Sequence, residues 1–595
     1  MRSTRMIIAV AALGASILSL AGCADTGPDA ESSVAIGTSD RFSSYNTTTP
    51  SGSASGNADI TTLTLSNFTS YDESLEVAPD TSFGTVEKIS DDPLVVRYTV
   101  SDSATWSDGT PVGAADLLLD WAAHSGALNT ADFDPTDYRA AVSDNGAADL
   151  PEDIVFFDSG ARPDSGLGLA SELPQLSDDG RSMTITYSHA ITDWRIALPP
   201  PLPAHVVAQN ALEVESHEDA AQAIIDAVSH EDFTALSKIS SWWNTGFALE
   251  NVDSPEETYL SSGPYVIDDI DSEKGITLSA NPEYSGAHRP SIATVNVRYL
   301  DDPAAQVAAV ENGDVDVISP QATPAVAEQL AALDDLTTLT GLVASFEHID
   351  LQFGASANGT FDDPLVREAF LKTIPRKAIV EKLIEPIVGS KAQTRDSFVF
   401  TPGTSGYDES AAGAAFPAVD IAGAKALLDE AGTPKPEVCI LYAANNPRRA
   451  AEFDMIAKSA SQAGFSVTDC GTDHWRQLLG VPGKYDAAIF AWQSSSLGAV
   501  DSESRYATKA RNNLNGYSSK TVDALFRDMS ETEDAGEQSE LLADVDSELR
   551  ADFYGAPLYQ FPSITAFDPD RIAGISPRVI APSLTWNLWE WRSFE

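Results

Sequence analysis

Positive charge is scarce in this sequence. Against 89 aspartates and glutamates stand 36 lysines and arginines, which gives a formal net charge of −53. Binding to nucleic acid requires a basic face that neutralises phosphates, so the composition argues against nucleic acid as a partner. The acidic residues are dispersed, with no long acidic tail. They therefore predict a solvated surface rather than a charged interaction segment.

Cysteine is also rare. The 595 residues include three cysteines, Cys23, Cys439 and Cys470. Cys23 belongs to the N-terminal segment considered below, which leaves Cys439 and Cys470 as a pair. In an exported protein such a pair is expected to form a disulfide, and two buried thiols are the alternative. A disulfide here would reinforce the fold and take no part in ligand binding.

Catalytic and metal-binding motifs are missing. Residues 52–56 (GSASG) have alanine where a nucleophile elbow needs serine. His217 and His230 are each followed by glutamate, but neither has a second histidine at the spacing of a zinc motif. No phosphate-binding loop is present. We therefore assign no catalytic residue, no metal ligand and no cofactor, and predict that the chain is not an enzyme.

Long apolar runs are absent beyond the N-terminus. A short basic start precedes a mostly apolar segment, residues 6–20, which is shorter than the ~20 residues of a membrane-spanning helix. Small residues and Cys23 follow, a pattern that describes a secretory signal and resembles a bacterial lipobox. We predict a signal peptide over 1–22, lipidation of Cys23, a flexible tether over 23–33, and a location on the extracellular face of the cell membrane. The alternative is an ordinary signal peptide with a chance cysteine.

The rest of the chain reads as a mixed α/β protein, and its length predicts several lobes. In the C-terminal half, strand and helix patterns alternate. Residues 437–442 and 465–468 are predicted strands, with a predicted helix over 448–463 between them. Such a βαβ unit implies parallel strands, which places Cys439 and Cys470 near the start and the end of the unit.

Six blocks of sequence, in order, resemble the solute-binding proteins of peptide-type ABC importers, the family 5 proteins that bind oligopeptides, dipeptides and nickel. The blocks are VRYTV at 96–100, WSDGTPV at 106–112, PLPAH at 201–205, SGPY at 262–265, AVENGDVD at 309–316 and DPLVREA at 363–369. A further resemblance, at 243–247, 448–465 and 586–591, is to an actinobacterial branch of that family.

This resemblance implies an α/β, two-lobed periplasmic-binding-protein-like fold of class C. Lobe I would span 34–320 and carry an inserted subdomain at about 68–255. Lobe II would span 321–555, and residues 556–595 would return to lobe I. The ligand would be enclosed between the lobes by a hinge motion, and a monomer is expected.

The resemblance also implies a function. The chain would be the lipid-anchored substrate-binding component of an ABC importer, capturing oligopeptides and delivering them to a permease and its ATPase. Backbone hydrogen bonds and bridging waters would hold varied peptides. The alternatives are the same fold with a non-peptide solute (a metal chelate, haem, a sugar or an opine), a receptor that senses peptides without transport, and a secreted hydrolase.

Three segments are expected to face the ligand. The ligand-binding residues predicted on them are Tyr45, Asn46, Phe346, His348, Asp350, Trp492 and Gln493. In the peptide binders, an aspartate shortly after the tryptophan pairs with the free ammonium of the peptide. Here no acid follows Trp492 before Asp501. Asp350 or Asp501 would have to replace that aspartate, or the ligand is not a simple peptide.

Overall fold

The computed structural model describes residues 28–594, apart from 73–76, 162–165, 171, 192, 355, 403–405, 414–415, 417, 493–498, 511, 531 and 533. The predicted signal peptide, the lipidation at Cys23 and the predicted ligand residue Gln493 lie outside the described residues. Across the part of the chain that is described, no helix combines the length and the apolar character required to cross a membrane.

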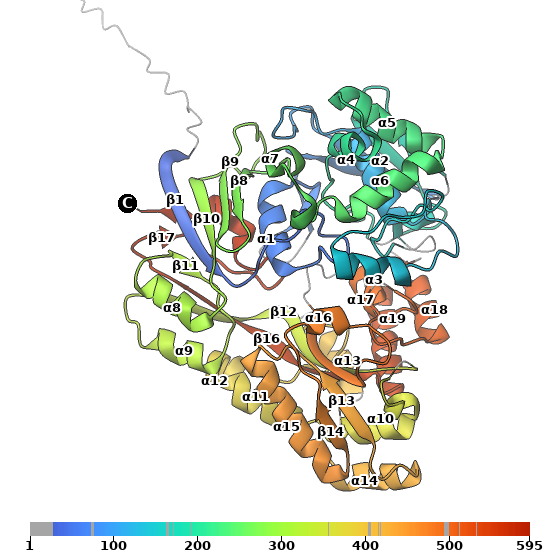
Figure 1. Cartoon of the computed structure of the whole chain (residues 1–595), viewed down its shortest axis with the longest axis vertical. Helices are drawn as coiled ribbons and strands as arrows, with labels where there is room; N and C mark the ends of the chain where they lie inside the picture. Colours follow the sequence, from blue (N-terminus) through green and yellow to red (C-terminus); the bar gives the residue numbers. More distant parts are fainter. Residues whose placement is uncertain are drawn as a thin grey trace, which may run out of the picture.

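A ten-stranded sheet runs through the whole molecule (Figure 1). In spatial order its strands are β14 (Ser466–Asp469), β13 (Glu437–Leu441), β15 (Ala487–Trp492), β12 (Thr337–Leu351), β16 (Gly555–Phe567), β11 (Val317–Ile318), β1 (Asp29–Thr38), β10 (Ile292–Tyr299), β9 (Gly275–Ala280) and β8 (Tyr265–Asp271). Strand β1 begins earlier than the predicted start at residue 34. Asp29 pairs with Ile292, and the Ser32 hydroxyl accepts the Ala293 N–H at 2.9 Å, so the end of the predicted tether lies against β10.

The two longest strands, β12 and β16, join the two halves of the molecule. They pair antiparallel, with residues 337–342 of β12 against 562–567 and residues 346–350 against 555–560. The ladder is interrupted between Leu342 and Phe346, where the Ala344 N–H bonds the Val579 carbonyl instead, at 2.7 Å. Since both strands lose their mutual hydrogen bonds at this point, it is the natural place for a hinge.

Two large hydrophobic cores lie on either side of this crossing. The first is built mainly from residues 34–299, with 567–591 added, and we call this part lobe I. The second is built from residues 307–489, with 556–566 added, and we call it lobe II. Helix α8 (Pro303–Glu311) packs its apolar residues into the second core. The predicted domain boundaries stay predictions.

Lobe I carries a second sheet with its own helices, at the upper right of Figure 1. The strands, in spatial order, are β4 (Gly84–Asp91), β5 (Leu94–Val100), β7 (Ser182–Thr186) and β6 (Gln175–Leu176), and the helices are α2 (Ala114–Ser125), α4 (Ala204–Leu212), α5 (His217–Ser229) and α6 (Phe233–Thr245). Asp116 joins α2 to α4, because its carboxylate accepts the N–H groups of Gly113 and Ala204, each at 2.8 Å. The start of α4 is thereby fixed beside the turn that precedes α2.

Lobe II contains the predicted βαβ unit. Strands β13 and β14 pair in parallel, and α15 (Pro447–Ala463) connects them. A disulfide joins Cys439 to Cys470, with the two Cα atoms 5.6 Å apart. The other long helices of lobe II are α10 (Pro364–Leu371), α11 (Arg376–Leu383), α14 (Ile421–Glu430), α17 (Ala499–Tyr506), α18 (Lys520–Ser530) and α19 (Ala535–Ala551).

Candidate functional site

The lobe II half of β12 presents three of the predicted ligand residues on one face. Side chains alternate along a strand, so Phe346, His348 and Asp350 point one way and Glu347 the other. Trp492 lies opposite Phe346 on the neighbouring strand β15. The rings of His348 and Trp492 are nearly parallel, with centroids 6.0 Å apart. The structure therefore brings these four predicted residues together.

Asp350 is fully engaged within this face. One carboxylate oxygen lies 2.7 Å from the His348 Nδ1, and the other accepts the Tyr554 hydroxyl at 3.2 Å. The Asp350 side chain is 6% exposed. A ligand ammonium would have to break these contacts, so Asp350 is poorly placed to replace the missing acid.

Two buried arginines flank the aromatic residues of this face. The Arg395 guanidinium lies 3.7 Å from the centre of the Phe346 ring, and the Arg505 guanidinium lies 5.3 Å from that of Trp492. Burial, and then the nearby charge of Arg505, lower the pKa of Arg395 to about 10. The indole N–H of Trp492 has no hydrogen-bond partner among the described residues. We call Phe346, His348, Trp492, Arg395 and Arg505 the arginine–aromatic cluster.

The opposite face of β12 holds a buried charge network. Glu347 pairs with Arg449 at 3.0 Å and with Arg448 at 3.6 Å, both from the start of α15. Glu452, one turn further along α15, accepts a short hydrogen bond from the Tyr559 hydroxyl of β16. Burial raises the pKa of Glu452 well above its usual range, and the charge of Glu347 adds to this. The network thus anchors α15 to both crossing strands.

A pocket of about 130 Å³ opens in lobe I, beyond the carboxyl ends of three strands. Its wall includes Thr38 at the end of β1, Tyr299 at the end of β10, and Ser319 directly after β11. Strand β1 runs parallel to both of its neighbours. In α/β sheets, ligands bind just outside the carboxyl ends of parallel strands, so this pocket is where a ligand is expected.

Two carboxylates line the pocket, Asp40 from the loop after β1 and Asp59 from α1 (Ser55–Thr64). Burial, and then the charge of Asp40, raise the pKa of Asp59 to about 8. Among the described residues, no hydrogen bond or ion pair engages the Asp59 carboxylate. An acid with raised pKa and no partner, lining a pocket, is a candidate for direct contact with a cationic group.

The pocket faces positive charge from lobe II. Arg476 belongs to α16 (Trp475–Leu478), which lies on the side of lobe II nearest lobe I (Figure 1). Burial, and then the charge of Arg449, lower the pKa of Arg476, while the carboxylate of Asp40 in lobe I opposes them. The charges of Asp40 in lobe I and Arg476 in lobe II therefore interact across the region between the lobes.

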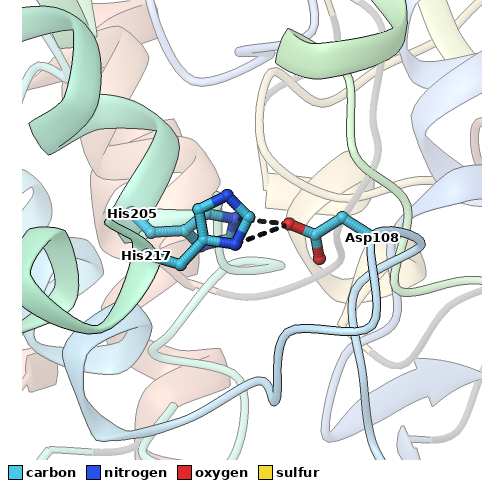
Figure 2. Close-up of side chains that lie close together, drawn as sticks. All are labelled: Asp108, His205 and His217. Atoms are coloured by element: carbon cyan, nitrogen blue, oxygen red, sulfur yellow. Dashed lines mark hydrogen bonds and ion pairs between the residues drawn. The ribbon is translucent and has the colours of Figure 1, made fainter. Parts of the chain in front are cut away.

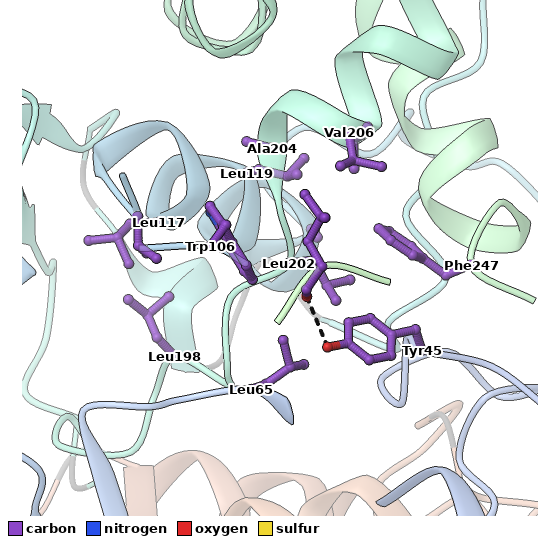
Figure 3. Close-up of a cluster of buried hydrophobic side chains, with 14 of the residues drawn as sticks. Tyr45, Leu65, Trp106, Leu117, Leu119, Leu198, Leu202, Ala204, Val206 and Phe247 are labelled. Carbon is purple, nitrogen blue, oxygen red and sulfur yellow. Dashed lines mark hydrogen bonds between the residues drawn. The ribbon is translucent and has the colours of Figure 1, made fainter. Parts of the chain in front are cut away.

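Tyr45 and Asn46, predicted to contact the ligand, are used inside lobe I. Figure 3 shows Tyr45 within a cluster of buried apolar side chains, and its hydroxyl donates to the Leu260 carbonyl at 2.9 Å. The Asn46 amide donates to the Trp243 carbonyl at 3.0 Å. Neither residue lines the pocket. The loop after β1 does reach the pocket, but through Asp40 and Phe42. An acidic residue shortly after the first strand is the feature of the sequence that could have identified Asp40 as a pocket residue.

The family model of bacterial extracellular solute-binding proteins, family 5 Middle, matches residues 76–513. An uncharacterized lipoprotein of Mycobacterium tuberculosis strain H37Rv is 26% identical to the chain over 556 residues, 92% of this chain and 90% of that protein. The oligopeptide-binding protein OppA of the same strain is 22% identical, over 81% of this chain and 72% of that protein.

Solved structures show the same fold. A periplasmic EDTA-binding protein, EppA, superposes with a TM-score of 0.76 at 19% identity, covering 96% of this chain and 98% of that chain. The oligopeptide-binding protein AppA of Bacillus subtilis, solved with a nonapeptide, gives a TM-score of 0.70 at 16% identity, with 95% and 99% covered. Both likenesses support the two-lobed architecture.

Proposed function

Because the chain belongs to the bacterial extracellular solute-binding proteins of family 5, we propose that it captures oligopeptides between its two lobes and delivers them to an ABC permease and its ATPase. The observation that carries the peptide assignment is the Asp59 carboxylate, which lines the pocket at the strand ends without a partner. A free peptide ammonium is the group that such a carboxylate would hold. In this proposal Asp59, helped by Asp40, replaces the acid that is missing after Trp492.

The arginine–aromatic cluster supplies the facing wall in lobe II. Phe346 is buried beneath the Arg395 guanidinium, so the half-buried Trp492 ring supplies the flat apolar surface, and its indole N–H, which has no partner among the described residues, is the proposed donor to a peptide carbonyl. Contacts of this kind tolerate varied side chains, since they recognise the backbone of the ligand. The names of the lipoprotein relatives support lipidation at Cys23, which would hold the protein at the extracellular face of the membrane. The prediction that the chain is not an enzyme rests on its family membership.

Calorimetry with matched peptides tests the proposal. We expect a tetrapeptide with a free amine to bind the protein, and its N-acetylated form to bind about 10- to 100-fold more weakly, because a charge-assisted hydrogen bond contributes about 1.5–3 kcal/mol. Asp59→Asn should remove most of this difference. Asp314→Asn, a change at an exposed acid that does not line the pocket, should leave it intact. Equal binding of both peptides by the unmodified protein would contradict the proposal.

A polycarboxylate solute is a second candidate. Buried Arg395 bonds the Gln560 carboxamide and backbone carbonyls, and no carboxylate pairs with it within the described part of the chain. An anionic ligand would supply the missing charge. Melting temperatures measured with citrate and with metal-free chelators separate the two candidates, because only a ligand that binds the folded state raises the melting temperature. A shift with these anions and none with peptide pools would favour the second candidate.

A further inference from the structure

Three side chains of lobe I converge away from the pocket (Figure 2). Asp108 comes from the turn before α2, His205 from the first turn of α4, and His217 from the first residue of α5. One ligand atom from each lies within 4.8 Å of the others. Helices α4 and α5 stand at the upper right of Figure 1, far from the crossing of β12 and β16. The group is therefore independent of the solute site.

The spacing of these atoms matches a metal coordination shell. Zinc binds imidazole nitrogen at about 2.0–2.1 Å and carboxylate oxygen at about 2.0–2.2 Å in tetrahedral geometry, which places neighbouring ligand atoms about 3.4 Å apart. The Asp108 Oδ2 lies 3.2 Å from the His205 Nε2 and 3.4 Å from the His217 Nδ1. Little movement would be needed to admit an ion between the three.

The surroundings hold these ligands in place. The Thr110 N–H donates to the Asp108 Oδ1 at 2.8 Å, and the Thr110 hydroxyl lies 3.0 Å from the Asp108 Oδ2 and 2.9 Å from the His217 Nδ1. The His205 side chain is 3% exposed and meets the edge of Trp106. The bond to Oδ1, which is not the proposed ligand atom, orients the carboxylate as in known metal sites. The Thr110 hydroxyl bonds Oδ2 and Nδ1 themselves, so it has to rotate away when an ion binds.

We propose that Asp108, His205 and His217 bind one divalent transition-metal ion of borderline softness, for which Zn²⁺ is the probe. Two imidazoles and one carboxylate suit this class of ion. The partly exposed His217 leaves the fourth position to water. The ion ties the turn before α2 to the starts of α4 and α5, so it stabilises the subdomain whether or not solute is bound.

The proposal departs from the sequence prediction of no metal ligand. The three residues lie far apart in the chain and match no metal-binding motif. Two of them, Asp108 and His205, belong to sequence blocks that a family resemblance explains without any metal. The fold alone reveals that they meet His217.

Calorimetric titration of Zn²⁺ into the metal-free full chain, purified in detergent, tests the site. We expect one ion per chain. His217→Ala, at a side chain that is 48% exposed, should weaken binding by at least about 10-fold without unfolding the protein. Asp108→Asn should do the same. His230→Ala is the matched control: this exposed histidine follows α5, its ring bonds the Asp226 carbonyl, and the variant should bind zinc like the wild type.

X-ray absorption of the zinc-loaded protein should show nitrogen and oxygen neighbours at about 2.0–2.2 Å, including the imidazole scattering pattern. Circular dichroism checks that each variant is folded. The proposal is overturned if the wild type takes up no zinc at micromolar concentration. Equal affinity of the His217→Ala and His230→Ala proteins would overturn it as well, since the ion would then sit elsewhere.

Discussion

The charge of Asp59 depends on what occupies the pocket. Its pKa of about 8 in the free protein means that it is mostly protonated at pH 7. A ligand ammonium favours the carboxylate, so binding at neutral pH should release a proton. We expect affinity for a free-amine peptide to rise with pH to about 8 and to fall above it, because the peptide amine, with a pKa of about 7.7–8.0, then loses its own proton. Calorimetry in two buffers of different ionisation enthalpy measures the proton released.

The raised pKa of Asp59 also affects the stability of the free protein, which should fall as pH rises. The folded state keeps the Asp59 proton up to about pH 8, whereas the unfolded chain loses it near the ordinary value of 3.8. The contribution of Asp59 to the free energy of unfolding therefore falls as pH rises between these values. Asp59→Asn should abolish both the proton release and this slope. Proton release that persists in the variant would assign the effect to another group.

Replacing Glu347 or Glu452 by glutamine should lower the stability of the protein by unequal amounts. Glu347→Gln removes the carboxylate nearest to Arg449 and leaves Glu452, 3.8 Å from Arg448, as the remaining acid of the network, and we expect it to lower the free energy of unfolding by about 3–5 kcal/mol. Glu452 has a raised pKa and accepts from Tyr559, so Glu452→Gln replaces a mostly neutral group and should cost less than about 1 kcal/mol. Urea unfolding of the two variants compares them directly, and equal losses would refute the assignment.

Residue-scale predictions from the sequence succeeded where the pattern of a strand fixes direction. The alternation along residues 346–350 placed Phe346, His348 and Asp350 on one face. The sequence did not identify Asp59 as a pocket residue, because a single acid on a helix, with no pattern around it, does not indicate a binding site. Tyr45 shows the converse. Its position after the first strand was predicted, but the choice between ligand contact and a buried hydroxyl bond depends on Leu260, 215 positions away.

At the scale of elements, the disulfide connects the two strands of the βαβ unit at the edge of the sheet. It closes a loop with a sequence separation of 31 residues. The chain-entropy model for a loop of this length gives a stabilisation of about 3–4 kcal/mol. We expect reduction to lower the stability of lobe II by this order, and the intact mass to rise by two hydrogen atoms. A Cys439→Ser/Cys470→Ser variant should match the reduced wild type and show no further change on reduction.

Regular elements were predictable because their signals are local. The parallel pair β13 and β14 and the helix between them follow from hydrophobic periodicity and from residues that can end a helix. The early start of β1 at Asp29 was not predictable in this way. Its first residues are polar, and they are ordered by pairing with β10, more than 250 positions away. Long-range pairing of a polar segment leaves no periodic pattern.

For the whole molecule, the net charge of −53 should affect how solutes arrive. A strongly acidic protein attracts cations from a distance, and salt screens that attraction. We expect lysine-containing peptides to associate about 10-fold faster than glutamate-containing peptides of equal length at about 0.01 M salt, and the ratio to approach one at about 1 M. Stopped-flow fluorescence measures the rates, with an uncharged peptide as control. A ratio that does not change with salt would place the preference in the pocket rather than in the overall field.

The two-lobed architecture itself was predicted through a family resemblance, since no local pattern reveals how distant strands join into one sheet. The least predictable feature of this architecture is the position of β16 in the order of the strands. This strand lies between β12 and β11 and completes the sheet of both lobes, yet it comes from residues 555–567 near the end of the chain. During synthesis, neither lobe can have its full set of strands until residues 555–567 have been made. The last part of the chain therefore controls when both lobes can complete their folding.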